Sequence, residues 1–161
     1  MNTENTIYVS GAIAAKKARN GKIYWLVVKM NEDSEWEIPK ITARRGESTV
    51  RASLRMMGEQ AGMTARVLEE AGRTRRTSSI NGKSVTKMTL YYLLLQQSAG
   101  EIIGFHNGSW FEYAKAVRTL KQKKEKEMLR SAKKELTIWR KENKIKDAIE
   151  EFLLKQQEKE K

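Results

Sequence analysis

The sequence predicts an α+β domain in which a mixed β-sheet is packed by helices. Three observations lead to this fold class. Two Asn-Gly pairs stand between extended segments, as is typical of β-hairpins. A segment with helical spacing interrupts the strands, and the segment 121–161 is rich in helix formers and contains neither glycine nor proline. The resulting order of strand, strand, helix, three strands and helix favours an α+β domain.

The first two strands are expected at 7–14 and 22–29, where β-branched, aromatic and small residues gather. The pair Asn20-Gly21 between them predicts a two-residue turn, because both residue types tolerate a positive φ. The two strands should therefore pair in an antiparallel hairpin. A polar loop at 31–34 and a short extended piece at 36–38 follow, and the latter leads into Pro39, the only proline.

A turn at 46–48 is expected to lead into a helix with Ser48 as its N-cap. Gly62 is expected to end this helix, because glycine readily adopts the left-handed conformation of a C-terminal cap. The apolar spacing predicts one buried face made of Val50, Leu54, Met57 and Ala61.

Beyond this helix, strands are expected at 65–68, 73–80 and 85–97, with Asn81-Gly82 as the turn between the last two. A loop at 100–108 and a return to the core at 110–112 follow. From about Tyr113 the chain is expected to be helical almost to its end, and Asn143 could interrupt that helix. We divide the chain into a flexible N-terminus at 1–5, a domain at 6–136 and an amphipathic helical extension at 137–161.

The charge and composition limit the classes of function. The formal net charge is +12 and the pI is about 9.9, which favours polyanionic partners such as nucleic acid, although a lysine-rich solvated surface would carry the same charge. The chain has no cysteine, which excludes disulfides and thiolate zinc sites. The sequence has no signal-peptide pattern and no apolar run long enough to cross a bilayer. We therefore expect a soluble, cytoplasmic protein that does not bind membranes.

The segment 36–63, WEIPKITARRGESTVRASLRMMGEQAGM, resembles the Nudix box, G-x5-E-x7-R-E-U-x-E-E-x-G-U, where U is a bulky aliphatic residue. The flanking residues Trp36, Pro39 and Lys40, and the later segment 110–114, are similar to the branch that includes diadenosine polyphosphate and diphosphoinositol polyphosphate hydrolases. The resemblance implies a Nudix-like mixed sheet sandwiched between helices over residues 6–136. The box positions that this chain keeps are Glu47, Arg55, Met57, Glu59, Gly62 and Met63.

The box is degenerate at the positions that carry the chemistry of the family. Ile41 replaces its first glycine, and Met56 and Gln60 replace two of its three clustered glutamates. In the family those glutamates hold divalent cations against a diphosphate, and a thioether or a neutral amide is a poor substitute. Glu59 is then the one remaining carboxylate of that cluster and the candidate catalytic or metal-binding residue, and an active enzyme with substituted ligands could recruit Glu47 and Glu101 beside it. For Glu47, the resemblance implies a structural role in pairing with Arg55.

Basic residues gather around the expected cleft. Arginine can grip phosphate oxygens with two parallel hydrogen bonds, so cations could do part of the work that metal ions do in related enzymes. An alternative for the group at 73–76 is that its charges protect an exposed strand edge from pairing. The candidate phosphate-binding residues are Lys40, Arg44, Arg45, Arg51, Arg55, Arg73, Arg75 and Arg76.

These observations leave two main classes of function. The first is an inactive Nudix-like module that binds a polyanion, with RNA or a ribonucleoprotein as the favoured partner and a phosphate-rich small molecule as another. It needs no cofactor. The second is a hydrolase of nucleoside diphosphate-linked or dinucleoside polyphosphate substrates, which would use Mg²⁺ or Mn²⁺. A third alternative is that nothing binds in the cleft.

The extension carries an apolar stripe that the domain does not account for. Helical spacing predicts that this stripe contacts a protein partner or a second copy of the chain, although it could also fold back on the domain. Its residues are Trp139, Ile145, Ile149, Phe152 and Leu153.

Overall fold

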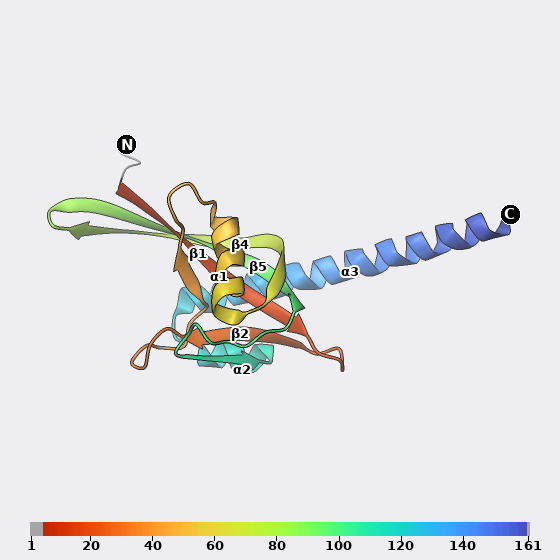
Figure 1. Ribbon diagram of the computed structural model, residues 1–161, viewed down its shortest axis with the longest axis horizontal. Coiled ribbons are helices and arrows are strands. Elements are labelled where there is room, and N and C mark those ends of the chain that lie inside the picture. Colours follow the sequence, from red (N-terminus) through yellow and green to blue (C-terminus); the bar gives the residue numbers. More distant parts are fainter. Residues whose placement is uncertain (1–4, 161) are drawn as a thin grey trace.

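The computed structural model describes residues 5–160, so residues 1–4 of the expected flexible N-terminus lie outside the described part of the chain. The fold is α+β, as the sequence predicts (Figure 1). Its elements are β1 (Thr6–Lys17), β2 (Ile23–Lys29), β3 (Lys40–Thr42), α1 (Thr49–Ala61), β4 (Thr64–Ile80), β5 (Lys83–Ser98), β6 (Asn107–Phe111), α2 (Tyr113–Thr119) and α3 (Lys123–Lys159).

The strands form one mixed sheet in the order β4-β5-β1-β2-β6, and β3 pairs with β1 beside this path. β1 is parallel to β5 and antiparallel to both β2 and β3. The N-terminal half of β1 pairs with β3 and its C-terminal end pairs with β2, so β1 lies at the centre of the fold. A parallel pair next to antiparallel pairs gives the mixed sheet that was expected.

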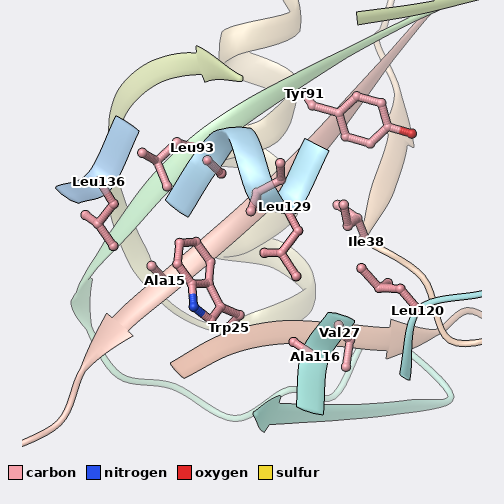
Figure 2. Packing of buried hydrophobic residues seen from close by; sticks show 12 residues of the cluster. Ala15, Trp25, Val27, Ile38, Tyr91, Leu93, Ala116, Leu120, Leu129 and Leu136 are labelled. Carbon is pink, nitrogen blue, oxygen red and sulfur yellow. The ribbon is translucent and has the colours of Figure 1, made fainter. Parts of the chain in front are cut away.

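Alternate residues of β1 face two separate hydrophobic clusters, one on each side of the sheet. Ala12 and Ala14 face α1, where they pack with Met56 and Met57. Ile13 and Ala15 belong to the other cluster, which α2 and α3 cover. Figure 2 shows this second cluster, with side chains of α2 and α3 converging on the strands, namely Ala116, Leu129 and Leu136 around Ala15, Trp25 and Val27. We call the two sides the α1 face and the α3 face.

The two expected hairpins both form, but with different turns. Asn81 and Gly82 have φ of 53° and 77° and make the predicted two-residue turn between β4 and β5. Between β1 and β2, only Gly21 has a positive φ, of 85°. Asn20 instead accepts a hydrogen bond from the Lys22 amide at 3.0 Å through its side-chain oxygen, and the loop spans residues 18–22. The predicted two-residue turn at this position is therefore wrong.

One strand assignment also needs correction. The segments 65–68 and 73–80 belong to a single strand, β4, whose pairing with β5 shifts register at three places. Bulges absorb the irregular residues between the two segments, so the strand does not have to end. The expected extended piece at 36–38 contributes one bridge, between Val28 and Glu37, and the regular strand in this region is β3.

The ends of α1 are as predicted, and its buried face is as predicted at Met57 and Ala61 but not at Val50 and Leu54. Ser48 accepts a hydrogen bond from the Arg51 amide at the start, and Gly62 has a φ of 60° at the end. Val50 and Leu54 are each 37% exposed. The buried face is rotated by roughly a quarter of a turn, because small residues let the helix approach the sheet closely. Its members are Ala52, Ser53, Met56, Met57 and Ala61.

The C-terminal region differs from the expected single helix. The helix stops after Thr119, Leu120 is extended, and α3 begins at Lys123 and then runs to Lys159 without a break at Asn143. The first part of α3 packs on the sheet, and the remainder projects away from it (Figure 1). Among residues 5–160, no helix is both long and apolar enough to cross a membrane.

Candidate functional site

The loop before α1 is joined to the helix by one carboxylate. Glu47 accepts hydrogen bonds from Arg55 Nε at 2.8 Å and from the Arg44 main-chain amide at 3.0 Å. The hydrogen bond from Arg55, followed by that from the Arg44 amide, lowers the pKa of Glu47 to about 2. Glu47 therefore stays ionised under ordinary conditions, and it holds the loop in place against α1.

Positions 56, 59 and 60, at which the Nudix box has clustered glutamates, have three different environments in this structure. Met56 is fully buried and belongs to the core of the α1 face. Gln60 is partly buried; its main-chain oxygen accepts from two amides of the 100–104 loop, and its side-chain Oε1 is buried without a hydrogen-bond partner. Glu59 is half exposed and lies 3.6 Å from Arg55 and 4.0 Å from Arg44. The helix thus presents one carboxylate, and arginines already surround it.

The residues of this helix do not fit a divalent metal cluster. Mg²⁺ requires a nearly complete shell of oxygen ligands, commonly with more than one carboxylate nearby. The structure brings no three acidic, histidine or cysteine side chains together as a metal site anywhere in residues 5–160. One neutral amide oxygen at Gln60 and one carboxylate at Glu59 do not replace such a cluster. Glu101, the nearest acid of the later loop, is exposed, and its main chain lies beside Gly62.

A cationic pocket of about 300 Å³ lies on the α3 face, between β3, the β4–β5 hairpin and the start of α3. The register pairs Thr74 with Thr89 and Arg76 with Lys87, so these four side chains point to the same face as Tyr91. The complete lining is Lys40, Thr74, Arg75, Arg76, Lys87, Thr89, Tyr91, Gln122 and Lys124. We call this recess the cationic pocket.

A buried carboxylate organises the base of the cationic pocket. Glu125 of α3 is fully buried and accepts three hydrogen bonds: from the Ile38 amide at 2.9 Å, from Lys40 Nζ at 2.5 Å and from the Tyr91 hydroxyl at 2.9 Å. Burial, reinforced by the negative charge of Glu125, raises the pKa of Tyr91. Tyr91 consequently remains a protonated donor. Through Glu125, α3 is fastened to β5 and to the segment that enters β3.

The approach of Tyr91 to the sheet depends on a glycine. Gly11 of β1 pairs with Tyr91 of β5, and a Cβ at position 11 would lie 2.5 Å from Cδ1 of the Tyr91 ring. Figure 2 shows the ring at the edge of the hydrophobic cluster of the α3 face. Gly11 therefore leaves the space in which Tyr91 reaches Glu125.

The charges of the cationic pocket do not cancel. Lys40 is paired with Glu125 and also lies 3.1 Å from Glu37. Arg76, Lys87 and Lys124 are exposed, and they take part in no ion pair within residues 5–160. The first turn of α3 adds main-chain amides at the same place, because α3 begins at Lys123. The arrangement can bind a phosphate group or another anion.

The structure divides the predicted phosphate-binding residues among several places. Lys40 and Arg76 line the cationic pocket, and Arg75 borders it, although strand alternation directs its side chain to the other face. Arg44 and Arg55 lie with Glu47 and Glu59 beside α1. The remaining three lie elsewhere: Arg73 is paired with Glu70 at 2.6 Å, and Arg45 and Arg51 are exposed.

The sequence did not predict Thr74, Thr89 and Gln122 of the lining, nor four residues that are central to the site, Lys87, Tyr91, Lys124 and Glu125. Lys87 could have been found, because a two-residue turn at Asn81-Gly82 fixes the hairpin register and places position 87 opposite position 76. The other three central residues depend on how α3 docks on the sheet, which no local pattern reveals. They are Tyr91, Lys124 and Glu125.

The comparisons with known proteins find a likeness in fold but none in sequence. No family model matches this sequence, and no curated protein matches it significantly. Many solved structures do match it in fold. An Ap4A hydrolase from C. elegans, in a binary complex, has a TM-score of 0.66 and 22% identity over 81% of this chain and 98% of its own.

Two further similar structures come from bacteria. The NUDIX domain of NrtR from Shewanella oneidensis, complexed with ADP ribose, has a TM-score of 0.61 and 14% identity over 84% of this chain and 94% of its own. A NUDIX hydrolase from Nitrosomonas europaea has a TM-score of 0.58 and 15% identity over 78% of this chain and 87% of its own. At such identities the likeness concerns the fold. Together with the mixed sheet and the helices on both of its faces, it shows that this protein has the Nudix fold.

Proposed function

We propose that this protein binds a phosphate-bearing ligand, of the kind that RNA and nucleotides present, in the cationic pocket. The observation that carries the proposal is the set of three cations without ion-pair partners among the described residues, Arg76, Lys87 and Lys124, around a recess of about 300 Å³. Guanidinium and ammonium groups hold phosphate oxygens through charge-assisted hydrogen bonds. In this function, side chains supply the positive charge and no phosphate bond is broken.

RNA, free or in a ribonucleoprotein, is the ligand that the charge of the whole chain favours. A net charge of +12 attracts polyanions from a distance. A recess of about 300 Å³ is at the small end of ligand pockets, which suits one nucleotide unit. One further cation of the β4–β5 hairpin, Lys83, lies by strand alternation on the same face as Lys87, where the rest of an RNA strand could contact the protein.

A second candidate function is hydrolysis of nucleoside diphosphate-linked or dinucleoside polyphosphate compounds. The observation in its favour is that solved structures of similar fold are named as hydrolases, including an Ap4A hydrolase. These names favour hydrolysis at least as well as they favour binding alone, and more directly than they favour RNA binding. Hydrolysis of this kind would depend on Mg²⁺ or Mn²⁺, which the residues at positions 56, 59 and 60 do not hold by themselves.

Binding is tested by titrating the full chain with a labelled single-stranded RNA and, separately, with a dinucleoside polyphosphate at several salt concentrations. We expect Lys87→Ala and Arg76→Ala each to weaken binding by about tenfold. Arg19→Ala is the matched control, because Arg19 is an exposed arginine in the loop at the other end of β1. A steep salt dependence is expected for RNA. Equal affinities of all three variants would contradict the proposed site.

Cleavage is tested with the same protein, Mg²⁺ or Mn²⁺, and a panel of dinucleoside polyphosphates and nucleoside diphosphate derivatives. We expect the ligand to be recovered intact. Turnover that Glu59→Gln abolishes would establish the second candidate and overturn binding without cleavage. In that case the affinity measurements with Lys87→Ala still report whether the cationic pocket holds the substrate.

A further inference from the structure

The projecting part of α3 carries large apolar side chains that nothing in the described chain covers. Ile138, Ile145, Ile149 and Phe152 are 50%, 62%, 53% and 60% exposed. Trp139, which the sequence groups with this stripe, instead packs against the cluster of the α3 face, with Arg66 over its ring at 5.7 Å. The unpartnered part of α3 therefore begins at Ile138 and extends beyond the body of the protein (Figure 1).

These side chains form a narrow stripe. At about 100° per residue, Ile138, Ile145, Ile149 and Phe152 fall within about 60° of the helix circumference. Positions 138, 145 and 152 are separated by seven residues each, which is the spacing of one seam position in a coiled coil. A single helix of this kind has one apolar side to bury against one partner helix. We call these four residues the α3 stripe.

The charges beside the α3 stripe are segregated along the helix. Residues 140–146 contain four basic residues and one acidic residue, whereas residues 147–151 contain three acidic residues and no basic one. Two such helices side by side in parallel would oppose like charges. In an antiparallel pair centred at Ile145, Arg140 of one copy instead lies level with Glu150 of the other, at both ends of the overlap, while Lys144 lies level with Lys146 near the centre.

We propose that the α3 stripe is covered by a second copy of this chain, in an antiparallel two-fold pair centred near Ile145. In this pair Ile145 meets Ile145 of the second copy, and Ile138 meets Phe152 of the second copy, because positions 138 and 152 lie equally far from 145. The two basic domains then lie at opposite ends of the helix pair, which limits the repulsion between two chains of +12 each.

The surface beside Ile138 suits this arrangement. A shallow recess of about 540 Å³ lies beside Ile138, lined by Tyr113 of α2 and by Arg130, Lys133, Lys134, Thr137 and Ile138 of α3, and carbon atoms form most of its surface. It is the place that Phe152 and Leu153 of the second copy reach in the antiparallel pair. The same contact occurs twice, once at each end, as two-fold symmetry requires.

The oligomeric state is measured by sedimentation velocity and light scattering on the full chain over a wide concentration range. We expect a dimer, and we expect Ile145→Glu to raise its dissociation constant by about a hundredfold or more. Leu154→Glu is the matched control, because Leu154 is 61% exposed but lies about 180° around the helix from Ile145. It should leave the dimer intact. Circular dichroism establishes that both variants keep their helix content.

The orientation is tested by cross-linking, for which the absence of native cysteine is convenient. Under mild oxidation Ile145→Cys should give a disulfide-linked dimer, because the two sulfur atoms lie near the two-fold axis. Phe152→Cys should not, because its neighbour is Ile138 of the second copy. A monomeric wild-type chain at every concentration, or equally ready cross-linking of both cysteine variants, would overturn the proposal. A monomeric chain would indicate that the α3 stripe binds a different protein or an RNA–protein assembly. Equal cross-linking of the two cysteine variants would indicate parallel helices.

Discussion

The two faces of the sheet use charged residues in opposite ways. On the α1 face, Glu47, Arg55, Glu59 and Arg44 form a connected group in which acids and bases alternate. On the α3 face, the carboxylates neutralise Lys40, and Arg76, Lys87 and Lys124 are left over. The segment that resembles the Nudix box therefore forms an internally balanced brace in this chain, and the surplus of positive charge lies across the sheet. The sequence alone draws attention to the α1 face, because the motif lies there.

The carboxylate at the centre of each group differs in burial. Glu125 has 1% of its side-chain surface exposed and joins groups from α3, β5 and the segment entering β3. Glu47 has 15% exposed and joins a loop to the helix that directly follows it. A buried ion that joins distant segments should matter more for stability than a partly exposed one that joins neighbours.

The largest effect is expected for Glu125→Ala. Removal of the Glu125 carboxylate leaves the Ile38 amide and the Tyr91 hydroxyl without their acceptor, and it leaves partly buried Lys40 with Glu37 as its remaining acidic partner. We expect a loss of about 3 kcal/mol in the free energy of unfolding, measured by urea denaturation. Glu127→Ala removes an exposed carboxylate two residues along the same helix and should change stability by less than about 0.5 kcal/mol. Similar losses for both variants would show that Glu125 does not anchor the α3 face.

The next effect tests how Tyr91 is positioned. Gly11→Ala places a Cβ against the Tyr91 ring, which is too buried to move aside, and we expect destabilisation by about 1–3 kcal/mol. Ligand affinity should fall as well, because Tyr91 borders the cationic pocket. The double variant Gly11→Ala/Tyr91→Leu removes the overlap. Its loss of stability should be smaller than the sum of the two single losses, and strict additivity would contradict the contact.

A smaller, pH-dependent effect is expected for Glu47→Gln. The folded-state pKa of about 2 lies below the ordinary value of 4.5. The ionised carboxylate therefore stabilises the fold above about pH 4.5, and this contribution is lost as the pH falls from about 4.5 to about 2. Wild type should be more stable than Glu47→Gln at neutral pH, and the difference should shrink through that window in urea denaturation. Glu69→Gln, at an exposed position of β4 with no ion pair in the described part of the chain, is the control and should show no such convergence.

The same contrast explains what the sequence could predict. The fold class, the cap at Ser48, the end at Gly62 and the turn at Asn81-Gly82 depend on residues close together in the chain, and each was predicted. The buried face of α1 was predicted only at Met57 and Ala61, because it depends on where the sheet lies relative to the helix. Ser53, for example, is buried, but its hydroxyl donates to the Val50 carbonyl, so a polar residue occupies a core position.

The candidate site shows the same limit. Arg76 and Lys87 could be placed together from the turn that joins their strands. The contribution of α3 could not, since Glu125 is 87 residues from its partner Ile38. Strand alternation also directs the side chains of Arg75 and Arg76 to opposite faces of the sheet, although the sequence alone places both residues in one basic group. A motif thus identified the fold, while tertiary packing decided which charges remain available for a ligand.

The smallest expected effect probes the outer surface of α1 and has the opposite sign. Gly58 is an exposed glycine within the helix, and a Cβ there would meet nothing within 4 Å. Gly58→Ala should stabilise the protein by about 0.5–1 kcal/mol, because alanine loses less backbone freedom on folding than glycine does. Affinity for RNA or nucleotides should not change if the ligand lies in the cationic pocket across the sheet. A ligand held against α1 beside Glu59 would meet the added methyl group. A loss of affinity in this more stable variant would therefore indicate that the ligand binds at the segment resembling the Nudix box.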